Sequence, residues 1–357
     1  MDKSLPDDPN TESELKRIVN RPTMRIAKSK HFLLMHDTPE KKAAGRQKNR
    51  AQERLDLLEQ VYESFLLLFH SQDVQLDIPK ERMKVVLFNE HQDYLEFATS
   101  WSPSLSSTSG FWEAQRNVSV FYDHATDEQF KGLQALMKEL REVKDDAKKA
   151  AKKGATNAKD IIRFVSTLEL LSEVAQENED ITVVSHEATH QMAGNTGLFP
   201  RSVLVPAWVH EGLATYFEAP GDAVWSGIGA VNADRLTWYR GLEPDRVHSN
   251  IGFIVGDQIF DFAATHGGKL HGYGQAWALT HFLLERHLKE FVAYYRMLGE
   301  MPPDVALSQE LLTELFNKAF QGTTRSSLDQ EWRSYMRSLK TDMDLVAERA
   351  EKSAKKK

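Results

Sequence analysis

Cysteine is absent from this chain of 357 residues. Its absence excludes disulfide bonds, cysteine nucleophiles and thiolate metal sites, so any metal ion must be held by histidine, aspartate or glutamate. A long apolar run is also missing, since no stretch approaches the roughly 18 residues that a membrane-spanning helix needs. We therefore expect no membrane span.

The N-terminus lacks the apolar core of a signal peptide. Its first residues, MDKSLPDDPNTESELKR, are polar and acidic, whereas a secretory signal has a basic start followed by an apolar segment. As written, the sequence predicts a cytoplasmic protein. The protein would be an exported one if a signal had been removed from this chain.

An excess of positive charge is also lacking. The formal net charge is −7, from 45 basic and 52 acidic residues, which argues against a protein dedicated to nucleic acid. The Lys/Ala-rich run AKKAAKKG ends at Gly154, but the acidic residues Asp145 and Asp146 stand beside it. A solvated helix face explains such a run better than a nucleic-acid site does.

The hydrophobic patterning that is present indicates an α+β protein. The predicted strands are HFLLMHD, RMKVVLF, GFWEA and VSVFYD, and the predicted helices beside them are AQERLDLLEQVYESFLLLF and EHQDYLEFA. They make a small mixed α/β sheet layer. Residues 127–178 have helical periodicity on both sides of Gly154, which predicts an inserted helical hairpin that turns near KKGATN. A mainly helical lower half follows.

These patterns divide the chain into five parts. They are a polar, loosely ordered N-terminus (1–27), the α/β sheet layer (28–126), the helical hairpin insertion (127–178), a helical subdomain (179–340) and a charged C-terminal tail (341–357). Chain ends are usually poorly ordered unless something ties them down. The helical subdomain carries the motif that bears on function.

The stretch VVSHEATHQMAGNTG contains His186 and His190, four residues apart, with Glu187 directly after the first histidine. On a helix of about 100° per residue, both imidazoles face one side and Glu187 lies beside them. The opposite side carries the apolar residues Ile181, Val184, Ala188 and Met192. We expect this helix to begin with Asp180 as its N-cap and to end near Gly194. The spacing is that of an HEXXH zinc motif, which also arises by chance in some sequences.

A zinc site of this kind needs a third protein ligand and one position left open for water. The extended form HEXXHXXGXXH is excluded, because Ala193 and Thr196 stand where glycine and histidine are required. The segment VPAWVHEGLATYFEAP instead offers Glu211, 21 positions after the second histidine. His210 is a rival ligand, but on a helix it points about 100° away from Glu211. We therefore favour Glu211.

HEATH followed by P-x-W-x-x-E-G-L-A-T-Y-F-E resembles the gluzincins, the peptidase MA-like clan of zinc metallopeptidases. The likeness is to an uncharacterised bacterial family of that clan, which shares sequence segments similar to SHEATHQ, GLFPR and EGLATYFE. It covers residues 28–340 and is strongest over 183–220. The resemblance implies a zincin-like fold in which the sheet layer lies above the zinc site. The edge strand, near Gly110–Asp123, would then lie along the substrate.

The resemblance also implies roles for single residues. It implies Zn²⁺ held by His186, His190 and Glu211. The acid that follows the third ligand by four residues in thermolysin-type members is Thr215 in this chain. Another residue must therefore orient a ligand histidine, and Glu218, further along the same helix face, is the candidate.

Tyr273, in YGQAWA, resembles in its placement a tyrosine that stabilises the oxyanion in the aminopeptidase branch of the clan. The Lys-Gly pair that accompanies this tyrosine there is replaced by Gln275 and Ala276. Tyr273 could also belong to a core stripe with Ala276, Trp277, Thr280 and Leu284. His281, at the edge of that stripe, is the reserve candidate for the same role.

The function expected from these features is that of a zinc metallopeptidase, in which Glu187 assists the attack of a zinc-bound water on a peptide bond. A peptide or protein would be the substrate, without nucleic acid as a partner. Two alternatives stay open. One is a catalytically idle, zinc-stabilised scaffold that binds a protein partner, and the other is a hydrolase of non-peptide amides. The sequence does not indicate an oligomeric state.

Overall fold

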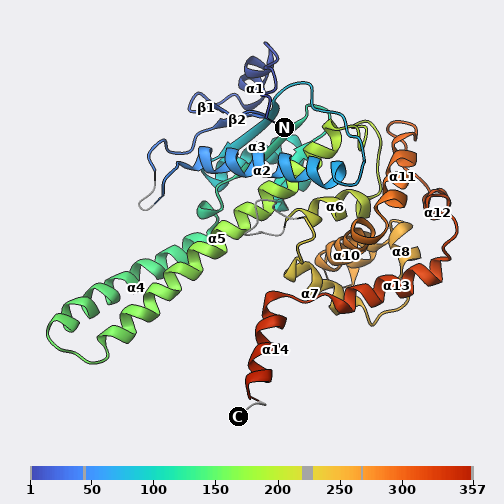
Figure 1. Cartoon of the computed structure of the whole chain (residues 1–357). Coiled ribbons are helices and arrows are strands. Elements are labelled where there is room, and N and C mark those ends of the chain that lie inside the picture. Colours follow the sequence, from blue (N-terminus) through green and yellow to red (C-terminus); the bar gives the residue numbers. More distant parts are fainter. Residues whose placement is uncertain (1, 43–45, 219–227, 267, 355–357) are drawn as a thin grey trace.

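The computed structural model describes residues 2–42, 46–218, 228–266 and 268–354. Figure 1 shows a sheet with helices on both faces, a helical half beside it, and a two-helix arm that projects from the body. The predicted α+β class is confirmed, because a five-stranded mixed sheet is combined with many helices.

The five strands form one sheet in the order β1-β2-β3-β5-β4. Their bounds are β1 Arg25–Lys28, β2 Phe32–His36, β3 Met83–Phe88, β4 Gly110–Glu113 and β5 Val118–Tyr122. Strands β2, β3 and β5 run parallel, whereas β1 and β4 pair antiparallel at the two edges. All four strands expected from the sequence are present, and β1 is an additional one.

Helices cover both faces of the sheet, which explains why every residue of the parallel strands is buried. The side chains of Leu33 and Met35 contact the layer formed by α1 (Thr11–Val19) and α3 (His91–Trp101). The alternate residues of β2 belong to the larger core, which includes α2 (Arg50–His70) and the helix that carries the HEXXH motif. Short 3₁₀ turns lie at Pro103–Ser107 (η1) and His124–Thr126 (η2).

The helical half packs around α10, which contacts α6 and α7. The bounds are α6 Ala207–Tyr216, α7 Ala233–Leu242, α8 Ile251–Val255, α9 Ile259–Thr265, α10 Leu270–Arg286, α11 Leu288–Gly299, α12 Gln309–Ala319 and α13 Arg325–Ser338. Trp208 and Trp277 are fully buried in its core, and the indole N–H of buried Trp332 donates to the carbonyl of Ala278 at 3.0 Å.

The predicted helical hairpin is present as α4 (Glu128–Lys152) and α5 (Ala158–Asn195), and it forms the projecting arm (Figure 1). Helix α5 does not end at the arm but continues into the body, where its last turns carry the HEXXH motif. The prediction that Asp180 caps a separate helix is therefore wrong. The N-cap is Asn157, and the sequence has no glycine or proline between Ala158 and Ala193 that would interrupt the helix.

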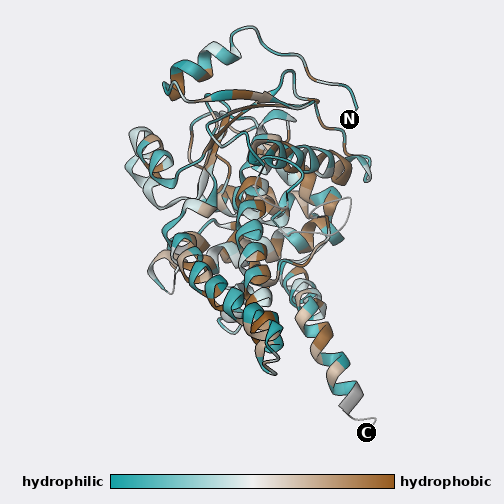
Figure 2. Ribbon diagram, turned by 90° about the vertical axis from the view of Figure 1, so that its left-hand side faces the viewer, coloured by the Kyte–Doolittle hydropathy of each residue, from teal (hydrophilic) through white to brown (hydrophobic). Residues whose placement is uncertain are grey.

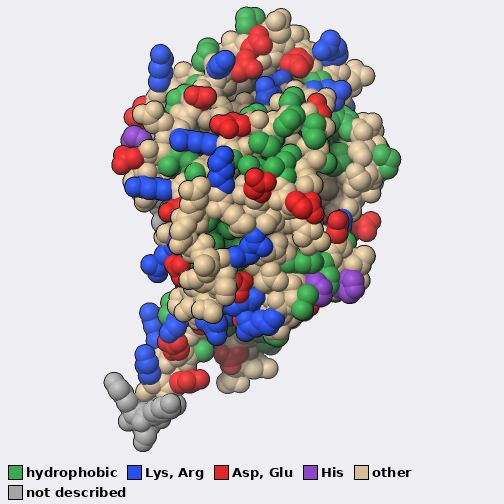
Figure 3. Space-filling model, turned by 90° about the vertical axis from the view of Figure 1, so that its right-hand side faces the viewer, with side chains coloured by type: hydrophobic (Ala, Val, Ile, Leu, Met, Phe, Trp, Pro, Cys, Tyr) green, Lys and Arg blue, Asp and Glu red, His purple; other side chains and the backbone are tan. Residues whose placement is uncertain are grey.

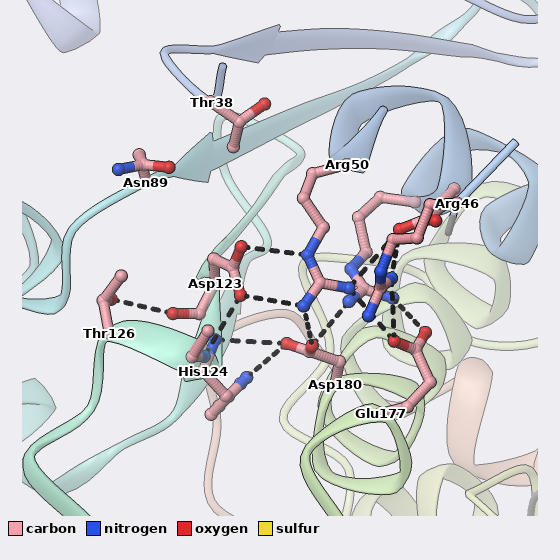
Figure 4. A network of polar contacts seen from close by, with 12 residues as sticks. Thr38, Arg46, Arg50, Asn89, Asp123, His124, Thr126, Glu177 and Asp180 are labelled. Atoms are coloured by element: carbon pink, nitrogen blue, oxygen red, sulfur yellow. Dashed lines mark hydrogen bonds and ion pairs between the residues drawn. The ribbon is translucent and has the colours of Figure 1, made fainter. Parts of the chain in front are cut away.

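Asp180 instead anchors α5 where the helix enters the body. Its buried carboxylate forms an ion pair with buried Arg54 at 2.5 Å and accepts a hydrogen bond from His124 at 2.8 Å. Figure 4 shows Arg50 extending between Asp180 and Asp123. The polar atoms of this mid-helix aspartate are thus paired with α2 and η2.

Helices form near both ends of the chain. Within residues 1–27, helix α1 buries Leu15 and Val19 against the sheet, because its apolar side chains are spaced four apart on one face. At the other end, α14 (Asp342–Ala354) extends from the body (Figure 1). Residues 355–357 of the predicted tail lie outside the described residues.

The surface carries charges of both signs. On the face shown in Figure 3, acidic and basic side chains are interspersed with apolar ones. Among the residues that the structure describes, no helix combines the length and the apolar character needed to cross a membrane.

Candidate metal centre

Three predicted ligands converge between α5 and α6. His186 and His190 stand one turn apart on α5, and Glu211 comes from α6. One ligand atom from each lies within 4.8 Å of the others. The Nε2 atom of His186 is 3.0 Å from Oε2 of Glu211, and Nε2 of His190 is 3.9 Å from the same oxygen. Two imidazole nitrogens and one carboxylate oxygen match a catalytic zinc site with an open position, so the cluster could hold a metal ion.

A close crossing of α6 and α10 sets the position of Glu211. At Gly212, an added Cβ would lie 2.2 Å from Oγ1 of Thr280 and 2.7 Å from the carbonyl oxygen of Ala276. Only glycine therefore permits this approach. The start of α6 is fixed by Asp257, whose carboxylate accepts hydrogen bonds from the backbone N–H groups of Ala207 and Trp208, at 3.0 and 3.1 Å.

Glu218 orients the first histidine. The Nδ1 atom of His186 lies 2.8 Å from Oε1 of Glu218, which leaves Nε2 to face Glu211. Arg235 donates two hydrogen bonds to the Glu218 carboxylate, at 2.8 and 2.9 Å, and Asn232 donates a third at 3.1 Å. Burial disfavours the charged form of Glu218, but the hydrogen bond from His186 and the charge of Arg235 lower its pKa nonetheless. These contacts place Glu218 where the predicted orienting role requires it.

Glu187 lies in the wall of a cavity of about 520 Å³ that also contains the three cluster residues. Its side chain is almost fully buried, and this burial raises the pKa of the carboxyl to about 7. The other wall is β4. At Gly110 of β4, an added Cβ would lie 2.8 Å from Cγ1 of Val183 and 3.1 Å from Cγ of Glu187. This glycine lets the edge strand approach the helix beside the candidate base.

Tyr273 reaches the same cavity from the first turn of α10. Its ring centroid is 6.4 Å from that of His186, and the guanidinium of Arg235 lies 5.2 Å from it. Burial raises the pKa of Tyr273 above its usual value, so its hydroxyl keeps its proton. The other residues of the core stripe considered for Tyr273, namely Ala276, Trp277, Thr280 and Leu284, are all buried. Tyr273 itself is only half-buried.

The rival histidines occupy other positions. His210 stacks on His190 with ring centroids 3.7 Å apart and planes 7° apart, so it packs against His190 without joining the three-residue cluster. The cluster contains Glu211, the ligand preferred from the sequence, and not His210. His281 is buried away from the cavity, and its Nδ1 atom lies 2.9 Å from the hydroxyl of Tyr335. It is therefore not placed to replace Tyr273.

Two further cavities adjoin the first. One of about 450 Å³ shares Trp112, His190, His210 and Glu211 with it. Its apolar wall consists of Phe199, Pro200, Val203, Leu204 and Val205. The other, of about 790 Å³, shares Glu179, Thr182, Glu218, Arg235 and Leu270 with the central cavity. The cluster thus lies within a groove that continues on both sides.

Some contributors to the centre were not foreseen. Arg235 and Asn232 hold Glu218, and Trp112 of β4 joins two cavities at the cluster. Asn232 also caps α7 by accepting from the N–H of Arg235. An asparagine before a helix is a recognisable cap signal, but nothing in the sequence links that helix start to the histidine pair.

A family model described as Protein of unknown function (DUF1570) matches residues 180–304. The matched segment contains both histidines, Glu187, Glu211 and Tyr273. It includes neither the sheet nor most of the arm. No curated protein matches the chain.

Proposed function

We propose that this protein is a zinc-dependent metallopeptidase. The observation that carries the proposal is the joint placement of four groups in one cavity. The cluster of His186, His190 and Glu211 lies beside the carboxylate of Glu187, and the edge strand β4 forms the opposite wall. The resemblance of HEATH and the following W-x-x-E-G segment to the gluzincins supports the same conclusion.

The three cluster residues would hold the ion, and Glu218 would keep the imidazole of His186 in the orientation that binding requires. When bound, zinc would supply a Lewis acid that polarises the scissile carbonyl and lowers the pKa of water. The burial of the site, with His190 almost inaccessible, would strengthen these electrostatic effects.

The remaining chemistry is assigned to side chains of this chain. Glu187 would accept a proton from the attacking water and pass it to the leaving amine nitrogen. The Tyr273 hydroxyl would donate a hydrogen bond to the carbonyl oxygen as negative charge develops there. Main-chain groups on the open side of β4 would pair with the substrate backbone, as an added strand does at a sheet edge.

Replacement of Glu187 by glutamine tests the proposal, because glutamine keeps the shape of the side chain but cannot accept the proton. A diverse peptide library is digested with the wild type and with Glu187→Gln, with and without chelator, and the products are identified by mass spectrometry. We expect cleavage by the wild type only, lost with chelator and restored by zinc. Glu187→Gln should retain bound zinc while its turnover falls at least about 100-fold.

Other outcomes would contradict the proposal. Zinc bound stoichiometrically by the wild type without cleavage of any peptide would favour the idle scaffold. Cleavage of acylated amines but not of peptides would favour a hydrolase of non-peptide amides. Cleavage by Glu187→Gln at the wild-type rate would remove Glu187 from the reaction.

A further inference from the structure

The arm carries an exposed apolar strip on α5. Its members are Phe164, Leu170, Leu171 and Val174, whose exposed fractions are 61%, 60%, 58% and 46%. Neighbouring residues such as Val165 are buried instead. Figure 2 shows apolar stretches along the two helices of the arm. An exposed apolar patch of this kind on a protein surface often marks an interaction site.

The direction of this strip on the helix links it to the metal centre. At about 100° per residue, Phe164 points within about 40° of Asn178, Thr182 and His186, and Leu171 points within about 60° of them, whereas Leu170 and Val174 point further round the helix. Asn178 and Thr182 line the groove cavities. Because α5 is one uninterrupted helix, the side that carries Phe164 and Leu171 on the arm faces the same way as the side that borders the groove in the body.

The distances along α5 suit a polypeptide that is longer than a short peptide. Val174 precedes His186 by 12 residues and Phe164 precedes it by 22, which correspond to about 18 and 33 Å along a helix. An extended chain advances about 3.3 Å per residue. A substrate whose scissile bond is at the cluster would therefore reach the strip about five to ten residues away.

We propose that the strip is a substrate-docking site, which binds an apolar stretch of an unfolded protein about five to ten residues from the scissile bond. The inference rests on the proposed peptidase function and names the substrate class: long, unfolded polypeptides. The continuity of the strip with the groove favours the substrate itself as occupant. The ion pair between Arg54 and Asp180, together with the contacts of α5 in the core, holds the arm in line with the centre.

The double variant Phe164→Gln/Leu171→Gln tests the docking site. Its matched control is Leu136→Gln/Val143→Gln, which removes side chains of similar exposure, 50% and 49%, from α4. Helix α4 ends in the arm and does not enter the groove. Two substrates are compared: reduced, carboxymethylated α-lactalbumin, and a six-residue peptide that spans one bond cut within it.

We expect the strip variant to raise KM for the unfolded protein about tenfold, since two apolar contacts are lost. Its kcat, and both constants for the six-residue peptide, should equal those of the wild type. The control variant should behave as the wild type with both substrates. Unchanged KM for the unfolded protein in the strip variant, or an equal rise in the control variant, would overturn the proposal.

Binding measurements separate this inference from the proposed function. Fluorescently labelled, carboxymethylated α-lactalbumin is titrated with Glu187→Gln protein, with and without the strip substitutions, and its anisotropy is recorded. Weaker binding by the strip variant supports docking even if no peptide is cleaved, whereas equal binding overturns it. A wild-type dimer that the strip substitutions convert into monomers, detected by sedimentation, would overturn it in favour of a second copy as occupant.

Discussion

At the scale of single residues, the carboxylate of Glu218 determines which nitrogen of His186 faces the cluster. The Nδ1 atom is engaged by Glu218 at 2.8 Å, while Nε2 lies 3.0 Å from Glu211. Arg235 and Asn232 in turn fix Glu218. A ligand histidine held in this way needs little reorganisation when an ion binds.

Glu218→Gln should therefore weaken zinc binding about 10- to 100-fold. Glutamine removes the negative charge that supports the His186 imidazole, and it leaves the buried Arg235 guanidinium without an opposite charge. Zinc affinity is measured by competition with a chromogenic chelator. Glu179→Gln is the control, since Glu179 is an exposed acid in the wall of the same cavity. If Glu218→Gln binds zinc as tightly as the wild type, Glu218 does not orient His186.

Under the proposed mechanism, Tyr273→Phe should lower kcat about 100-fold with little change in KM or zinc content, because it removes only the hydroxyl proposed to assist the developing oxyanion. Steady-state kinetics on a cleaved peptide and metal analysis of the purified protein provide the measurement. Tyr335→Phe is the control, since its hydroxyl contacts the remote His281. If both variants keep the wild-type kcat, Tyr273 serves only to pack against Arg235.

At the scale of elements, the centre depends on how closely α6 approaches α10. Gly212 directly follows Glu211 of the cluster, and the space that a side chain at Gly212 would need is occupied by Thr280 and the backbone of Ala276. The crossing thus places the candidate ligand Glu211 next to this close contact. A change in helix separation would move the carboxylate away from the histidines.

Gly212→Ala should lower stability by about 1–3 kcal/mol, because the added methyl forces the two helices apart, and it should also weaken zinc binding. Urea unfolding with and without zinc measures both effects. Gly132→Ala on α4 is the control, since an added Cβ there meets nothing within 4 Å. That substitution should be neutral or slightly stabilising, as alanine is the better helix former. A stable Gly212→Ala protein with wild-type zinc affinity would show that the crossing tolerates a methyl group.

At the scale of the whole molecule, α5 joins the arm, the sheet layer and the metal centre. The Asp180 network fixes this helix at the junction of the three. The charged and titratable groups facing Asp180 are Arg50 and Arg54 from α2, His124 from η2, neighbouring Asp123, and Glu177 one turn earlier on α5. Burial would raise the pKa of Asp180, but Arg54, His124 and Arg50 together lower it.

Because the folded pKa of Asp180 lies below its unfolded value of about 3.9, its stabilising contribution is complete above that value. The contribution is lost as the pH falls through the folded pKa. Asp180→Asn should destabilise the protein by up to about 3 kcal/mol at pH 7, and the difference from the wild type should shrink below about pH 4. Urea unfolding of both proteins between pH 7 and pH values below about 4 measures this difference in stability. The exposed Asp145→Asn serves as control. A difference that is independent of pH would exclude the ion pair as its cause.

Much of the site could be predicted because it depends on local geometry. The spacing of His186 and His190 places both imidazoles on one side of any helix, whatever surrounds it. The apolar residues opposite them, such as Val184, Ala188 and Met192, belong to the larger core, but the side that carries the motif is buried as well. The helical hairpin followed from periodicity on both sides of Gly154. The continuity of α5 was not predicted, because Asp180 has the side chain of an N-cap, and its partners Arg54, Arg50 and His124 are brought to it by the tertiary structure.

The sequence by itself thus determined the α+β class, the histidine pair with its adjacent acid, and the set of residues from which a third ligand could come. The tertiary structure decided that Glu211, and not His210, completes the cluster, and that Glu218 and Arg235 support it. The physical reason why the sequence could not decide these points is that the residues in contact are far apart along the chain. Contacts across four residues are fixed by the helical repeat, but those from His186 to Glu211 and to Glu218 span 25 and 32 residues. Such contacts exist only because α5, α6 and α10 pack at one particular distance.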